Sequence, residues 1–166
     1  MAIDESTLAR QPITLGEWGR LFCFRTTWGM ICGFAGTVYL LWIYNAWLPS
    51  YLQMERHFSI AKTGWVAAIP FVFGIFGSLS GGFLCDFLLR RGVAPVPSRK
   101  WPMSIALLAG SFFTALAAIT PDNAFAVGFI ALAMFLLYVA SSAAWAMAGV
   151  AAPGNSAASL GALQNF

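Results

Sequence analysis

Residues 63–85, TGWVAAIPFVFGIFGSLSGGFLC, contain no Asp, Glu, Lys or Arg. A transmembrane helix needs about 20 consecutive, mostly apolar residues, because each residue advances the helix by only about 1.5 Å through the bilayer. Three further charge-free windows occur, at residues 26–54, 101–121 and 123–166. Windows of this length predict a protein that crosses a membrane several times.

The composition agrees with this interpretation. Of the 166 residues, 60% are hydrophobic and only 9% are charged, whereas about a quarter of the residues of a soluble domain are charged. The three cysteines, Cys23, Cys32 and Cys85, form no C-x-x-C or Cys/His pattern, so we expect neither a metal nor another cofactor. The net charge of +3 resides in the segments between the windows, and we expect no nucleic-acid partner.

The windows predict an all-α integral membrane protein with a bundle at residues 27–166, preceded by a cytoplasmic segment at residues 1–26. Its helices are expected near residues 27–49, 64–88, 103–120 and 125–148, with a break at APGNS (152–156) and a helix at 157–166. The last of these is too short to cross a bilayer. We therefore expect four complete spans and a truncated fifth, which makes the chain a fragment.

The basic residues predict the orientation, because cytoplasmic loops of membrane proteins are enriched in Lys and Arg. Seven basic residues would lie on one side and two on the other. The seven are Arg10, Arg20, Arg25, Arg90, Arg91, Arg99 and Lys100, and the two are Arg56 and Lys62. This asymmetry places the N-terminal tail in the cytoplasm of a multi-pass protein of the cell's inner or plasma membrane.

Glycine spacing predicts how the helices meet. Gly74, Gly77 and Gly81 fall on one helical face of the second span, and small residues at this spacing let two helix backbones approach closely in lipid. A similar face occurs in the first span, at Gly29, Gly33 and Gly36.

The segment GGFLCDFLLRRG, residues 81–92, places Asp86 at the C-terminal end of the second span. A carboxylate is disfavoured there by the partial negative charge of the helix end, unless a cation or the N-terminus of another helix receives it. Gly82, Arg90 and Arg91 suggest a gating clamp at the cytoplasmic mouth of the bundle. The alternative is a solvated cluster of interfacial charges.

This segment resembles the G-x-x-x-D…R-R-G signature of the major facilitator superfamily, in the copy between its eighth and ninth helices. Phe87 stands where the superfamily often has a basic residue. NAWLPSYLQMERHFS (45–59) resembles the outer end of helix seven in the anion:cation symporter branch. WAMAGVAAPGNSAASLGALQNF (145–166) resembles helices ten to eleven of the sugar-acid carriers in that branch.

The resemblance implies that this chain corresponds to helices 7–11 of a carrier whose N-terminal half is a missing partner. It implies alternating access by two rocking halves around a midplane site. The substrate would be a small organic anion such as a hexonate, hexuronate or hexarate, and the coupling ion a proton. The charge-free windows hold no ionisable carboxylate, His, Lys or Arg, which agrees with coupling groups located in the N-terminal half.

Neutral polar residues are the candidates for substrate binding. Tyr138, Ser141, Ser142 and Trp145 are spaced i, i+3, i+4 and i+7, which places them on one face of a helix. Hydroxyl groups and an indole suit a polyhydroxylated substrate, although serines in membrane helices often bond back to their own helix. Asn45, Gln164 and Asn165 are further polar candidates, and the resemblance places substrate contacts at Trp145 and Asn165.

Two other functions compete with a carrier. A membrane-embedded enzyme needs intramembrane catalytic groups, such as paired aspartates, a Ser/His pair or a metal-binding His cluster. With one histidine in the chain and no acid in a window, the sequence argues against an enzyme. A structural or assembly subunit without transport activity would need only the glycine faces.

Overall fold

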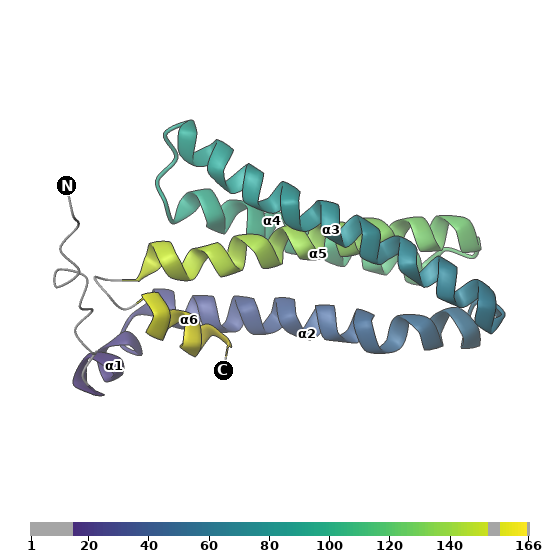
Figure 1. Ribbon diagram of the computed structural model, residues 1–166, viewed down its shortest axis with the longest axis horizontal. Coiled ribbons are helices and arrows are strands. Elements are labelled where there is room, and N and C mark those ends of the chain that lie inside the picture. The colour runs from purple at the N-terminus through teal and green to yellow at the C-terminus, as the bar shows by residue number, and fades with distance from the viewer. Residues whose placement is uncertain (1–14, 153–156, 166) are drawn as a thin grey trace, which may run out of the picture.

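The computed structural model describes residues 15–152 and 157–165. In these ranges the chain forms helices joined by short turns (Figure 1). The helices are α1 (Leu15–Leu21), α2 (Arg25–Met54), α3 (Ile60–Arg90), α4 (Pro97–Ile119), α5 (Asn123–Ala151) and α6 (Ala157–Asn165). The segment 1–14, most of the expected break at 152–156, and Phe166 lie outside the described residues.

Four helices, α2 to α5, are long and apolar enough to cross a membrane. Three of the expected spans lie inside these helices, and the expected span 103–120 extends one residue past the end of α4 at Ile119. Each helix is longer than its expected span: α2 begins at Arg25 and α3 ends at Arg90. Helix formation continues past the charge-free windows because a long basic side chain at a helix end can place its head in the interface. The short helix α1 was not expected from the sequence.

The four long helices alternate in direction, and each of α3, α4 and α5 runs antiparallel to the helix before it in the sequence (Figure 1). The turns that join them are short and carry specific end signals. Ser59 accepts a hydrogen bond from the Lys62 N–H at the start of α3, and Asp122 accepts from the Ala124 and Phe125 N–H groups at the start of α5. Gly92 adopts a positive φ of 85° immediately after α3, the position where glycine commonly ends a helix.

Helix α5 forms the core of the bundle, and it contacts α3 and α4 more extensively than any other helices contact each other. A Cβ atom at Gly77 would collide with the backbone carbonyl of Phe135, and one at Gly81 would lie 2.7 Å from the Val139 carbonyl oxygen. The predicted glycine face of the second span is therefore the surface on which α3 approaches the α5 backbone.

The glycines of the first span behave differently. A Cβ at Gly33 would lie 2.8 Å from the terminal methyl group of Met103 on α4, whereas Gly29 and Gly36 have open space around them within the described residues. Gly82 also has room, because its nearest neighbour would be the Ser142 hydroxyl at 3.7 Å. The close approach of α3 to α5 therefore occurs at Gly77 and Gly81, as the glycine spacing predicted, and not at Gly82.

Arg56 ties the turn between α2 and α3 to the end of α4. Its guanidinium donates to the Ala117 and Thr120 carbonyls, each at 2.7 Å, and to the Tyr51 hydroxyl at 2.8 Å. Carbonyls at a helix C-terminus have no partner within the helix and attract cations. From the sequence, Arg56 was only one of the basic residues that predict the orientation. The structure shows that its guanidinium also caps the C-terminus of α4.

Candidate functional site

A hollow of about 430 Å³ opens between α2, α5 and α6. It brings together four of the predicted substrate residues: Asn45, Ser141, Trp145 and Asn165. The other lining residues all come from α2: Phe34, Val38, Leu41 and Trp42. We call this hollow the central cavity. Its lining consists of aromatic, aliphatic and neutral polar side chains and includes no ionisable group.

Trp145 is the aromatic side chain that α5 contributes to the central cavity. Its ring packs edge-on against Phe34, with the ring centroids 5.1 Å apart and the ring planes at 82°. The Trp145 side chain remains 53% exposed. The contact with Phe34 therefore fixes the orientation of the indole and leaves much of its surface free to pack against a ligand.

The polar residues of the central cavity are fixed to different degrees. The Asn45 amide donates to the Leu41 carbonyl, one turn earlier, at 2.7 Å. This bond orients the amide and leaves its oxygen available as an acceptor. Ser141 lies one turn before Trp145 on α5, and Asn165 enters from the end of α6. These groups offer donors and acceptors that suit the hydroxyl groups of a sugar acid.

The predicted stripe on α5 divides between two neighbouring helices. Tyr138 packs on α3, where a Cβ at Gly74 would lie 2.6 Å from its ring. Ser142 also lies against α3, next to Gly81 and Gly82. Ser141 and Trp145 line the central cavity instead. The four residues span an arc of the helix that is wide enough to meet both neighbours.

The residues of the predicted clamp follow one another along the last turns of α3 and its C-cap, and within this described segment no ion pair joins Asp86 to Arg90 or Arg91. Asp86 and Arg90 are exposed, and Arg91 follows the helix as its C-cap. The Arg91 guanidinium lies over the Phe87 ring, 4.8 Å from the ring centroid. Phe87, which stands where the superfamily signature often has a basic residue, therefore offers an aromatic face to this cation.

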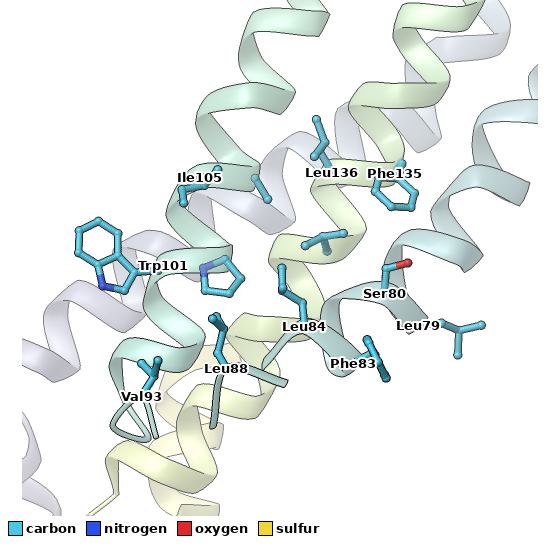
Figure 2. Close-up of a pocket in the computed structure, with 13 residues that line it drawn as sticks. Leu79, Ser80, Phe83, Leu84, Leu88, Val93, Trp101, Ile105, Phe135 and Leu136 are labelled. Atoms are coloured by element: carbon cyan, nitrogen blue, oxygen red, sulfur yellow. The ribbon is translucent and has the colours of Figure 1, made fainter. Parts of the chain in front are cut away.

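A larger hollow, of about 920 Å³, lies between α3 and α4 with α5 as its floor (Figure 2). Its lining is almost entirely apolar, as the sticks of Leu79, Phe83, Leu84 and Ile105 in Figure 2 illustrate. A polyhydroxylated anion would find few hydrogen-bonding partners there. Across residues 15–152 and 157–165, no three His, Cys, Asp or Glu side chains gather closely enough to hold a metal ion.

The sequence profile of the Major Facilitator Superfamily matches residues 3–166. The chain belongs to this superfamily. The superfamily consists of membrane transporters and not of enzymes, which decides against the membrane-embedded enzyme. The four long apolar helices accordingly belong to a multi-pass membrane protein, as the resemblance of residues 81–92 implied.

Curated relatives within the superfamily are named for sugar acids. The chain is 40% identical over 161 residues to the "Probable L-galactonate transporter" of Escherichia coli K12, covering 95% of this chain and 35% of the relative. It is 33% identical over 100 residues to the "D-galactonate transporter" of E. coli O6:H1, covering 60% of this chain and 23% of the relative. It is 30% identical over 132 residues to the "Hexuronate transporter" of Bacillus subtilis 168, covering 77% of this chain and 31% of the relative.

The chain thus spans about a third or less of the length of these relatives.

Sequence reasoning found only Asn45 among the α2 residues that line the central cavity, although a signal for the others was present. Phe34, Val38, Leu41 and Asn45 recur at intervals of three or four residues, so extending the helical face backwards from Asn45 would have found them.

Proposed function

We propose that the full-length protein is a secondary active carrier that transports a hexonate, hexuronate or hexarate together with protons by alternating access. The observation that carries this proposal is the central cavity, in which Trp145, Ser141, Asn45 and Asn165 converge from three helices. Its neutral donors, acceptors and indole suit the hydroxylated part of a sugar acid. The relatives' names support the same substrate class.

Because the central cavity has no ionisable lining residue, the carboxylate and the proton require charged groups elsewhere. The N-terminal half of the carrier is the proposed source, and it closes over the open side of the cavity as the two halves rock. An intramembrane ionisable residue is the usual site of proton coupling.

The test uses the full-length protein in proteoliposomes, with labelled galactonate, glucuronate and galactarate as probes. We expect uptake of at least one of them, accelerated by an inward proton gradient and reduced when a protonophore collapses that gradient. Lack of uptake for all three acids would favour a structural subunit instead. Uptake at a rate that does not depend on the proton gradient would refute proton coupling and leave the carrier function standing.

We further propose that the basic ends of the helices face the cytoplasm. Single cysteines at Ala94 and Glu55 probe the two sides, because both positions are exposed. Ser98, in the same basic segment as Ala94, would be a poor position for the cysteine, because its side chain is fully buried and donates to the Pro95 carbonyl. In intact cells, and in a background without Cys23 and the other native cysteines, an impermeant thiol reagent should label Glu55→Cys but not Ala94→Cys. The reverse pattern would invert the topology.

The clamp at Asp86 is proposed to act in the conformational step. In the full-length carrier, Asp86→Asn should slow exchange of substrate across the membrane and leave substrate affinity nearly unchanged, because the carboxylate lies at the helix end and not in the central cavity. Exchange rates and binding isotherms measured on the same preparation check this. A wild-type exchange rate in the variant would mean that Asp86 is merely solvated.

A further inference from the structure

A third hollow, of about 470 Å³, lies at the basic end of the bundle between α2, α4, α5 and α6. We call it the basic cavity. In Figure 1, α6 lies beside the beginning of α2, at the end of the bundle where α4 also begins and α5 ends. The volume falls within the range of about 300–1,000 Å³ that is typical of small-molecule sites.

Two cations line the basic cavity. Arg25 is the first residue of α2, and Lys100 lies in the first turn of α4. Neither helix has a side-chain hydrogen-bond cap or an acidic residue in its first turn. The positive end of each helix dipole therefore adds to the charge of the side chains. These features together favour an anion at this end of the cavity.

Gln164 provides an independent sign of a ligand. Its side chain lines the basic cavity and is only 5% exposed. The amide nitrogen donates to the Ala144 carbonyl at 3.0 Å, whereas the amide oxygen is buried and has no hydrogen-bond partner among the described residues. Buried acceptors are nearly always paired. An ionised carboxylate has no proton to donate to this oxygen, but a hydroxyl group does.

We propose that the basic cavity is a second binding site for the sugar acid. The carboxylate lies between Arg25 and Lys100, and a hydroxyl group donates to the Gln164 oxygen. This inference rests on the proposed function and extends it, because it assigns the substrate a position outside the central cavity.

The two cavities are adjacent along three helices. On each helix, one residue lines the basic cavity and the next residue lines the central cavity. The pairs are Gly33 and Phe34 on α2, Ala144 and Trp145 on α5, and Gln164 and Asn165 on α6. A sugar acid that leaves the central cavity towards the basic end of the bundle therefore meets the basic cavity next. Its carboxylate is drawn towards the cations that the central cavity lacks.

The test is a binding isotherm of the full-length carrier in nanodiscs of zwitterionic lipid, with galactonate as the probe. The wild-type carrier should bind two galactonates. Lys100→Gln should weaken one of the two sites by roughly tenfold, equivalent to about 1.4 kcal/mol, and Gln164→Leu should weaken the same site. Lys62→Gln, which removes an exposed cation at the other end of the bundle, should leave both sites unchanged.

The outcomes separate this inference from the proposed function. A single site that Lys100→Gln leaves unaltered would overturn the inference and leave the carrier function standing, whereas no galactonate binding at all would overturn both. Galactitol, which has hydroxyl groups but no carboxylate, should not occupy the basic cavity. If the second site is lost in nanodiscs that contain phosphatidylglycerol, the cavity holds a lipid headgroup, and the proposed sugar-acid site is refuted.

Discussion

Replacing Gly77 by alanine should lower the stability of the full-length carrier strongly, because the new methyl group has no space. It would collide with the backbone carbonyl of Phe135, and a backbone cannot rotate away as a side chain can. Overpacking in a well-packed core costs about 1–3 kcal/mol, and a backbone collision belongs at the upper end. The melting temperature of the purified protein in detergent measures the loss, and Gly77→Val should prevent folding.

Gly64→Ala is the matched control for Gly77→Ala. It lies on the same helix, and a Cβ there meets nothing within 4 Å. This substitution should therefore have little effect or stabilise slightly, since alanine favours a helix more than glycine does. Equal melting temperatures for Gly77→Ala and Gly64→Ala would show that α3 does not approach the α5 backbone as closely as described.

Trp145→Ala should weaken sugar-acid binding by about tenfold or more. The substitution removes one of the two indoles, Trp42 and Trp145, that line the central cavity. Each lost hydrogen bond or aromatic contact contributes roughly 0.5–1.5 kcal/mol. Two such losses total about 1–3 kcal/mol, a range that includes the 1.4 kcal/mol corresponding to a factor of ten. Isothermal titration of the full-length carrier with the transported acid measures the change.

Trp65→Ala is the control for the loss of an indole. Trp65 is 82% exposed and lines none of the hollows described above, so its removal should leave the affinity unchanged. Ser142→Ala should also leave the affinity nearly unchanged, because Ser142 lies against α3. Wild-type affinity in Trp145→Ala would mean that the indole serves only to pack against Phe34.

The sequence was most informative where one physical requirement dominates. The bilayer demands long uncharged helices, so the four spans could be predicted from the positions of Asp, Glu, Lys and Arg. The glycine face of α3 was predictable for a similar reason, because close helix contact in lipid depends on small residues. Gly77 and Gly81 meet the α5 backbone as that spacing requires.

The partners of individual residues were harder to predict. A helical face has a direction, but the sequence does not say which neighbour covers it. Tyr138 and Trp145 share an arc of α5 and nevertheless contact different helices. Val139, on the same helix, is only 6% exposed and lies against Gly81 on α3.

Long-range hydrogen bonds were missed altogether. The bond between Arg56 and the Ala117 carbonyl joins residues 61 positions apart, and nothing in the local pattern around either residue points to the other. The Gln164 bond to the Ala144 carbonyl is of the same kind, because it depends on how α6 docks on α5. Such contacts follow from the packing of whole helices and not from local propensity.

Protection of a cysteine at Ser141 by substrate would show directly whether a sugar acid occupies the central cavity. Ser141 lines the central cavity, whereas Ser111 is exposed on α4 outside it. Each single-cysteine variant of the full-length carrier is alkylated with a thiol reagent, with and without a saturating sugar acid. The sugar acid should slow alkylation of Ser141→Cys and leave alkylation of Ser111→Cys unchanged. Equal alkylation rates of Ser141→Cys with and without the acid, under conditions where the acid is bound, would show that the acid does not occupy the central cavity.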